Sequence, residues 1–269
     1  MSAQERETTD VISDGPPTAR WLGAGRRAAR DGVRVLLGLV YPPRCIACQS
    51  ATAEAQALCA ACWSGFGFIE APCCERLGTP FPVDLGLGLV SPAAIADPPV
   101  FARARAVCRF DGVARDLVHK LKYGDRLDLA PVLGAMMAQA GRELIADADL
   151  IAPTPLHRAR LWSRRFNQAM ALAQAVSRRT GVPLAPAALT RVKRTRPQIG
   201  LTRAQRADNL QGAFRVRPEM RPMVEQRRIL LIDDVLTTGA TANAAARALL
   251  RAGARHVDVL TFARVVTDG

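Results

Sequence analysis

The chain has 269 residues, 49% of them hydrophobic and 23% charged, so it is long enough to bury one α/β core and a small additional module. Aromatic residues make up only 5%, which means that the core must be built mainly from Leu, Val and Ala. The formal net charge of +13 favours anionic partners such as phosphorylated metabolites, nucleic acid or acidic membranes. An Arg-rich and Ala-rich proteome would also produce such a charge, so the charge alone selects no partner.

Residues 1–41 are predicted to be a disordered tail followed by a short helix. The first 18 residues carry acids and no apolar segment, which excludes a secretory signal. A helix over residues 20–41 would either pack on the next module or bind a partner or a membrane surface. The apolar run at residues 33–40 is about half a membrane span, so we expect no span and a cytoplasmic location.

Two Cys-x-x-Cys pairs follow, and they predict a metal site in a module over residues 42–78. Each pair can present two thiolates from a tight turn, and four thiolates close a tetrahedron around Zn²⁺. A segment this small has no core of its own, so the metal would supply folding free energy. A redox function would need only one such pair, and disulfides are uncommon in a reducing compartment. We therefore predict one structural zinc with the ligands Cys45, Cys48, Cys59 and Cys62.

Three further cysteines receive no metal in this prediction. Cys73 and Cys74 are adjacent, which is not the spacing of an ordinary zinc knuckle, and no partner pair follows them. One of them is either a spare ligand or the remainder of a second pair, and we interpret both as structural. Cys108 lies in an apolar strand pattern and is interpreted as a small buried hydrophobic residue. Residues 79–102 are rich in Pro and Gly and predict a linker or a packed irregular loop.

Strand and helix patterns alternate over residues 103–269, which predicts a parallel sheet flanked by helices and connected by right-handed crossovers. Strands are expected over residues 104–110, 150–152, 184–192, 228–232 and 256–263. Helices are expected over residues 112–123 after an Asp111 cap, 127–146, 161–180 before a stop at Gly181, and 240–252. A basic, mobile loop with a helical turn is expected over residues 193–210.

The most informative segment begins at the expected strand 228–232, whose continuous apolar run is typical of a central parallel strand. Asp233 and Asp234 follow, at the carboxyl end where open α/β sheets bind ligands. The next helix begins after a Thr- and Gly-rich turn, and a helix N-terminus can hold a phosphate with its free N–H groups. We expect the acids to bind ribose hydroxyls and the turn to bind a 5′-phosphate through Thr237, Thr238, Gly239, Ala240 and Thr241.

This segment resembles the phosphoribosyl-pyrophosphate (PRPP) motif of type I phosphoribosyltransferases, which consists of four apolar residues, two acids and a Thr/Gly-rich loop. An ordinary Rossmann-like strand and helix start is the alternative. Paired acids at a strand end are costly unless a ligand uses them, which favours the PRPP motif. Ala240 stands where several phosphoribosyltransferases carry Gly, and a small residue still fits there.

The order of zinc ribbon and α/β domain is similar to that of the ComF family, whose founding members act in DNA uptake by competent bacteria. The resemblance covers about residues 42–266. Further segments that fit are Arg115–Tyr123, Pro153–Arg158, Arg164–Gln168 and Arg203–Gln211. The family ribbon usually has a further Cys-x-x-Cys pair, and its counterpart here is Cys73-Cys74 followed by Leu77-Gly78. This departure puts a second zinc in doubt.

The resemblance implies a pyrophosphate loop just past a strand end, formed by Pro155, Leu156, His157, Arg158 and Arg165. Its Arg residues would act as forked donors to pyrophosphate, or else belong to a solvated helix face. Residues 193–206 lie where the family fold has a flexible lid, with an ordinary basic loop as the alternative. Lys120 and Lys122 either face the same pocket or end a solvated helix.

The resemblance implies a protein that binds PRPP or a related phosphorylated ribose with Mg²⁺ and transfers phosphoribosyl to an unknown nitrogen acceptor. Asp233 and Asp234 would hold the hydroxyls or the metal shell, and catalysis would rest on positioning and charge neutralisation. The alternative is a non-catalytic module that senses PRPP or handles single-stranded nucleic acid. Single-stranded DNA and DNA-processing proteins are the expected macromolecular partners.

Overall fold

The computed structural model describes residues 42–83, 86, 88–124, 126–157, 166–193 and 210–266. The expected N-terminal tail and helix, part of the expected pyrophosphate loop and most of the expected lid lie outside these residues. Among the described helices, none combines the length and the apolar character that crossing a lipid bilayer requires.

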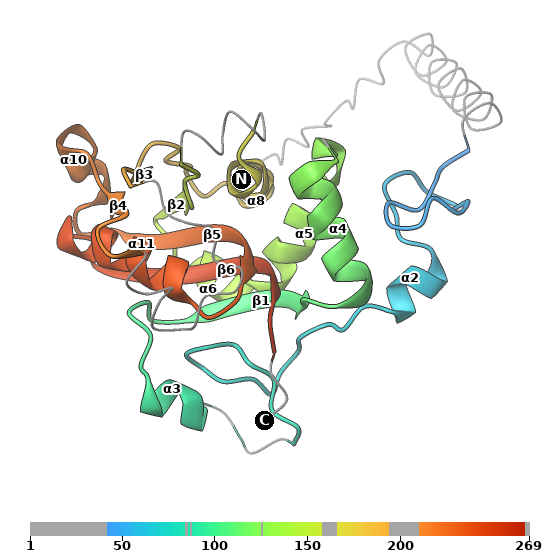
Figure 1. Ribbon diagram of the computed structural model, residues 1–269, viewed down its shortest axis with the longest axis horizontal. Helices are drawn as coiled ribbons and strands as arrows, with labels where there is room; N and C mark the ends of the chain where they lie inside the picture. The colour runs from blue at the N-terminus through green and yellow to red at the C-terminus, as the bar shows by residue number, and fades with distance from the viewer. Residues whose placement is uncertain are drawn as a thin grey trace, which may run out of the picture.

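The centre of the molecule is a sheet of four parallel strands in the order β1-β6-β5-β2 (Figure 1). The strands are β1 (Ala104–Arg109), β2 (Leu150–Pro153), β5 (Arg228–Leu236) and β6 (His256–Arg264). All three neighbouring pairs are parallel, so the predicted α/β architecture with a parallel sheet is confirmed.

Helices cover both faces of this sheet. One face carries α4 (Gly112–Tyr123), α5 (Ala130–Ala140) and α8 (Gln168–Thr180), and the other carries α11 (Ala240–Arg251). The side chains of β5 alternate between the two layers, because Leu230 and Ile232 join the core with α4, α5 and α8, while Ile229 and Leu231 join the core with α11. Burial on both faces explains the continuous apolar run in the sequence.

Short elements complete the chain. A two-stranded antiparallel sheet lies beside the α11 layer and consists of β3 (Thr190–Arg191) and β4 (Phe214–Arg215). The remaining helices are α2 (Ala60–Ser64), α3 (Pro92–Ala96), η1 (Leu127–Leu129), α6 (Arg142–Ala146), η2 (Pro218–Met220) and α10 (Arg221–Val224).

Two predicted elements are interrupted. The helix expected over residues 127–146 is split into η1, α5 and α6, and Gly141 lies between the last two, where an added Cβ would be 2.6 Å from Leu260. The strand expected over residues 184–192 is reduced to β3 and one bridge from Leu184 to Ile151, since Pro186 cannot continue a ladder.

The predicted helix caps had mixed outcomes. The Asp111 side chain makes no capping hydrogen bond to α4. The helix expected from residue 161 is described from Gln168 onward, where Asn167 accepts from the backbone N–H of Ala169 as the cap of α8. The stop at Gly181 is confirmed, with a φ of 77° in the left-handed region.

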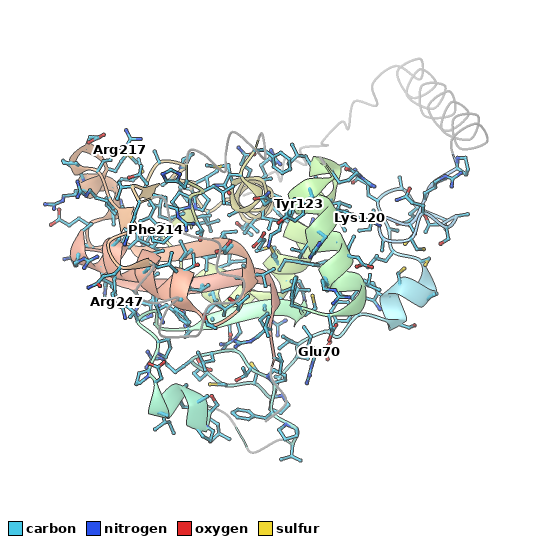
Figure 2. All side chains as sticks on the ribbon, in the orientation of Figure 1. Glu70, Lys120, Tyr123, Phe214, Arg217 and Arg247 are labelled. Atoms are coloured by element: carbon cyan, nitrogen blue, oxygen red, sulfur yellow. The ribbon has the colours of Figure 1, made fainter. Side chains whose placement is uncertain are left out.

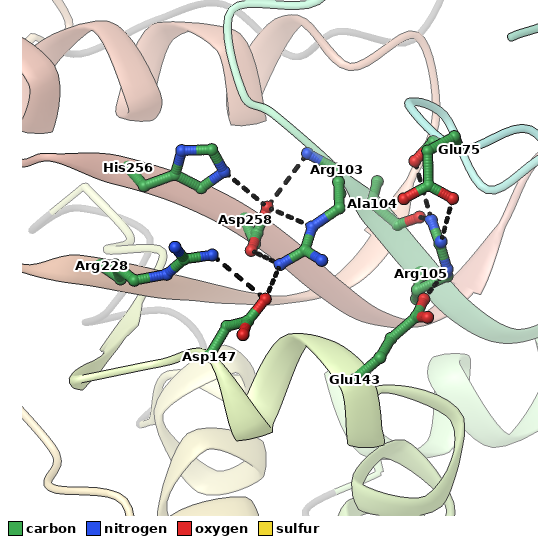
Figure 3. A network of polar contacts seen from close by, with 9 residues as sticks. All are labelled: Glu75, Arg103, Ala104, Arg105, Glu143, Asp147, Arg228, His256 and Asp258. Atoms are coloured by element: carbon green, nitrogen blue, oxygen red, sulfur yellow. Dashed lines mark hydrogen bonds and ion pairs between the residues drawn. The ribbon is translucent and has the colours of Figure 1, made fainter. Parts of the chain in front are cut away.

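A network of ion pairs ties together the amino ends of the strands, on the edge opposite the acids of β5 (Figure 3). Arg103 Nη2 lies 2.6 Å from Asp258 and 2.7 Å from Asp147, and Arg228 reaches the same Asp147 carboxylate at 3.1 Å. Hydrogen bonds to Asp258 raise the pKa of Arg103 above its usual range. The network joins β1, β5 and β6 at the edge opposite Asp233 and Asp234.

Helices α5 and α8 lie close together at Gly134, where an added Cβ would be 2.4 Å from the Cβ of Ala175. We predict that Gly134→Ala lowers the free energy of unfolding by about 1–2 kcal/mol, because the clash exceeds the gain in helix propensity. Gly134→Ala/Ala175→Gly moves the methyl group to the other helix and should recover most of the loss, as measured by chemical denaturation. A more stable Gly134→Ala variant would contradict this packing.

Candidate functional site

The candidate site begins where the neighbouring parallel strands β2 and β5 separate. Pro153 is the register partner of Ile232, and the N–H of Thr154 donates to the carbonyl of Ile232 at 2.9 Å. The segment after β2 therefore starts at the same edge of the sheet as the two acids. This brings Pro155, Leu156 and His157 to the acid end of β5, whereas Arg158 and Arg165 lie outside the described residues.

The two acids lie within β5 and not after its end, which corrects the predicted strand boundary. β5 continues to Leu236 because β6 still pairs with it there, whereas β2 ends at Pro153. Asp233 and Asp234 are thus held by a strand that has lost one neighbour. Asp234 is only 9% exposed, and Asp233 is partly buried.

A single lysine meets the acid pair. Lys122, in the last turn of α4, places its Nζ 3.0 Å from Oδ2 of Asp234. Lys120 extends instead toward the cysteine-rich region, where it donates to the carbonyl of Ala47, and Figure 2 shows it on that side of α4. Of the two lysines for which a place in the pocket was one alternative, only Lys122 contacts the acid pair.

The charge state of Asp233 is unusual. Burial raises its pKa, and the neighbouring Asp234 carboxylate raises it further, to about 7. The backbone N–H of Asp234, which donates to Asp233 Oδ1 at 2.9 Å, opposes these effects, as do Lys122 and Thr154. Near neutral pH, Asp233 thus exchanges its proton readily, and a bound cation would displace that proton.

The turn after β5 leads directly into α11. Gly239 caps this helix with a φ of 78°, a conformation that residues with a side chain adopt only with strain. The first turn of α11 contains no acid, and Thr238 Oγ1 is buried without a hydrogen-bond partner among the described residues. Thr237 is exposed at the mouth of the turn. The turn combines free donors with a positive dipole end, as an anion site requires.

Two residues that support this edge carried no specific role in the sequence prediction. Asn167 caps α8 and donates from Nδ2 to the carbonyl of Thr154 at 3.1 Å, which fixes the start of the loop after β2. Gln168 is buried and donates to the carbonyl of Lys122 at 3.4 Å, which fixes the end of α4. The sequence signal for them was weak, since a cap residue before a helix has many ordinary explanations.

The four predicted zinc ligands come together. The Sγ atoms of Cys45, Cys48, Cys59 and Cys62 all lie within 4.8 Å of one another, and those of Cys48 and Cys59 are 3.6 Å apart. Sulfurs around a tetrahedral zinc with 2.3 Å bonds are about 3.7 Å apart, so the donor set fits the metal. Burial opposes ionisation of Cys45, but backbone N–H groups of Cys48 and Cys59 lower its pKa to about 6.

Sequence comparison supports both halves of this architecture. Residues 36–93 match the double zinc ribbon domain, and residues 167–267 match the phosphoribosyl transferase domain. The DNA utilization protein YhgH of Escherichia coli O6:H1 is 32% identical over 177 residues, which cover 63% of this chain and 75% of that protein. Competence protein F of Haemophilus influenzae is 32% identical over 153 residues, or 55% of this chain and 66% of that protein.

The chain belongs to the ComF family. The DNA utilization protein YhgH of E. coli K12 is 29% identical to this ComF-family chain over 241 residues. The match covers 87% of this chain and 95% of YhgH. Together with the four-thiol cluster, the ribbon match supports a structural zinc. Among solved structures, the glutamine PRPP amidotransferase of B. subtilis complexed with ADP and GMP aligns at 22% identity and a TM-score of 0.36, over 52% of this chain and 30% of that chain.

Because its folded-state pKa is raised from 3.8 to about 7, Asp233 binds more protons in the folded than in the unfolded chain between these pH values. Its contribution to the free energy of unfolding therefore falls as pH rises through that window. We predict that Asp233→Asn stabilises the protein by about 1–3 kcal/mol at pH 8 and changes little at pH 4.

Thermal unfolding of wild type and variant across this range tests the effect. The matched control is Asp116→Asn on the exposed face of α4, which should leave the pH dependence unchanged. Parallel pH profiles for wild type and Asp233→Asn would contradict the raised pKa.

Proposed function

We propose that this ComF-family chain binds PRPP, or a closely related phosphorylated ribose, at the acid end of β5. The observation that carries this proposal is the acid pair of a buried strand followed at once by the glycine-capped N-terminus of α11. Ribose hydroxyls are neutral donors that suit carboxylates, and a 5′-phosphate suits free N–H groups. One ligand would thus satisfy both the acids and the turn.

The 5′-phosphate is assigned to the turn of Thr237, Thr238, Gly239, Ala240 and Thr241. Thr238 Oγ1 is a buried hydroxyl for which the described residues offer no partner, and a phosphate oxygen would supply one. Gly239 adopts the left-handed conformation, which lets the backbone turn sharply around an anion. The absence of acids in the first turn of α11 removes a source of repulsion.

The ribose and pyrophosphate are assigned to the acids and to the segment after β2. Asp233 and Asp234 offer carboxylate oxygens, which are ligands that Mg²⁺ prefers, so the donor set fits a Mg²⁺-bound ligand. When bound, Mg²⁺ would neutralise pyrophosphate charge. Binding would break the ion pair of Asp234 with Lys122 and leave that ammonium group free to contact the polyanion. Pro155, Leu156 and His157, with Arg158 and Arg165, would receive the pyrophosphate.

Transfer to a nitrogen acceptor is the reaction that such a complex supports. The bond from the anomeric carbon to pyrophosphate breaks with its electron pair leaving on pyrophosphate, and the acceptor nitrogen forms the new bond and releases its proton to water. The acids and the turn would hold the ribose so that the acceptor approaches the face opposite the leaving group. The relatives are named for DNA utilization and for competence, which supports the proposal that this chemistry serves such a process.

Calorimetric titration of the zinc-loaded protein with Mg²⁺–PRPP tests the proposal. We predict saturable binding in wild type, loss of measurable binding in Asp233→Asn/Asp234→Asn, and unchanged binding in Asp116→Asn. Loss should arise because the variant keeps the shape of the site but removes both carboxylate charges. No heat at millimolar PRPP, or equal binding in the double variant, would refute the site.

The same titration should show tighter binding of PRPP at pH 8 than at pH 6, because Asp233 ionises over this range.

Single-stranded nucleic acid is a second candidate ligand, favoured by the net charge of +13. We predict that the protein binds a single-stranded oligonucleotide, as measured by fluorescence anisotropy. The logarithm of the binding constant should fall linearly with the logarithm of the salt concentration, with a slope set by the number of phosphates that the protein neutralises. Asp233→Asn/Asp234→Asn should leave this binding intact, which separates it from the PRPP site. Binding without salt dependence, or none at physiological salt, would remove this candidate.

A further inference from the structure

The backbone of the first ribbon lobe, residues 43–65, is repeated in a second lobe, residues 72–97. In the first lobe, the N–H of Cys45 donates to the carbonyl of Ser50 (2.7 Å), and the carbonyl of Cys45 accepts from Gln49 (3.0 Å). In the second lobe, the N–H of Cys74 donates to the carbonyl of Thr79 (2.8 Å), and the carbonyl of Cys74 accepts from the N–H of Gly78 (2.7 Å). These two bonds join residues at the same separations along the chain as in the first lobe. Cys74 is therefore the counterpart of Cys45.

The correspondence extends through the whole turn. Each turn contains one residue with positive φ at the same step, Gln49 at 68° and Gly78 at 62°. The antiparallel bridges and the flanking hydrogen bonds also correspond, each shifted along the chain by the same number of positions. The bridge between Arg44 and Ala51 corresponds to the bridge between Cys73 and Pro80. The hydrogen bond from Thr52 N–H to the Pro43 carbonyl corresponds to the one from Phe81 N–H to the Pro72 carbonyl.

The second half of each lobe corresponds as well. Cys59 caps α2, and its N–H donates to Sγ of Cys45 at 3.3 Å. Ser91 occupies the cap position of α3, and its N–H donates to Sγ of Cys74 at 3.2 Å. Ser91 is therefore the counterpart of Cys59, and by the same spacing Ala94 is the counterpart of Cys62.

The four zinc-ligand positions of the second lobe are thereby identified. They hold Cys74, Leu77, Ser91 and Ala94 where the first lobe holds Cys45, Cys48, Cys59 and Cys62. Leucine and alanine carry no donor atom, and one thiol with one hydroxyl cannot close a tetrahedral site. Cys73 pairs with Pro80 at the position of Arg44, which is not a ligand position. The second metal that a double zinc ribbon implies does not fit this chain.

We infer that the second lobe has become a metal-independent brace, which keeps the ribbon backbone by docking on the sheet of the phosphoribosyl-type domain. The carbonyls of its turn accept hydrogen bonds from β1 and β6, where a metal would otherwise order the turn. The pairs are Arg105 Nη1 with Glu75 O (2.9 Å), Ala104 N with Arg76 O (2.9 Å), and Arg264 Nη1 with Leu77 O. Each contact joins the lobe to a strand that does not depend on zinc.

The fit between lobe and sheet is close. A Cβ at Gly78 would lie 2.3 Å from the carbonyl oxygen of Ala104, so no larger residue fits at this turn without displacing β1. Arg105 also binds the carboxylates of Glu75 (3.1 Å) and Glu143 (2.5 Å), which links the lobe to α6 across the sheet edge (Figure 3). The lobe is thus ordered by contacts with rigid elements.

Inside the lobe, one buried sulfur remains where the metal cluster would have been. Sγ of Cys74 accepts from the N–H groups of Leu77 (3.4 Å) and Ser91 (3.2 Å), and the residue is fully buried. The corresponding N–H groups of the first lobe point at a thiolate able to bind zinc. A single thiol therefore satisfies the donors that a metal–thiolate cluster satisfies in the first lobe.

Zinc analysis of the purified full-length protein by mass spectrometry tests the inference. We expect one zinc per chain in wild type, none in Cys48→Ser, and one in Cys74→Ser, because only the first lobe holds metal. Two zinc ions in wild type, or loss of the single zinc in Cys74→Ser but not in Cys48→Ser, would overturn it.

Restoring the donors gives the converse test. Leu77→Cys/Ser91→Cys/Ala94→Cys should raise the content to two zinc ions per chain and double the thiolate-to-metal absorbance after cobalt exchange. Folding of this variant is checked by circular dichroism, and a folded variant that still binds one zinc would overturn the assigned ligand positions.

Hydrogen exchange of the wild-type protein tests the brace without any substitution. Removal of zinc by a chelator should increase exchange at least tenfold over residues 43–65 and leave residues 72–97 protected. Equal loss of protection in both lobes would show that the second lobe depends on metal after all.

Discussion

Strand β5 must bury apolar side chains between two helical layers and, within the same strand, present two carboxylates to a ligand. Four buried residues end at Ile232, and the loss of β2 as a neighbour opens the edge at which Asp233 and Asp234 lie. Burial that stabilises the strand also raises the pKa of Asp233, so the carboxylate pair is destabilising until a cation or Lys122 neutralises it. A carboxylate pair perturbed in this way, held in a strand that is buried on both faces, is a candidate functional site.

A second group of charged side chains lies at the opposite edge of the sheet. A network of ion pairs there joins the amino ends of β1, β5 and β6 and is separate from the acid pair. It consists of Arg103, Asp147, Asp258 and Arg228. These charges pair with one another at the amino ends of the strands, whereas open parallel sheets bind ligands at the carboxyl ends. The ion pairs that join the strands and the acid pair of β5 therefore lie at opposite edges of the sheet.

Sequence reasoning recovered the central sheet because burial on both faces leaves an apolar run that few other structures produce. It also brought together the four thiols, whose spacing along the chain is local, but it ended the strand before the two acids, which lie within β5. It did not recover the close approach of Leu260 to Gly141, or the choice between Lys120 and Lys122, which depends on the residues that each one faces. Contacts between residues distant in sequence decided these features, and no local pattern encodes them.

The two ribbon lobes have the same turn backbone, but different interactions order it. In the first lobe, the fitting four-thiol cluster can supply folding free energy locally, while Ile46 and Ala47 join the core with α4 and Lys120 of α4 donates to the carbonyl of Ala47. In the second lobe, three consecutive carbonyls find donors on β1 and β6. These bonds give the turn partners that do not depend on a metal, and Sγ of Cys74 accepts from the N–H groups of Leu77 and Ser91 at the former ligand positions. The same backbone is therefore ordered by a four-thiol cluster in one lobe and by hydrogen bonds to the neighbouring sheet in the other.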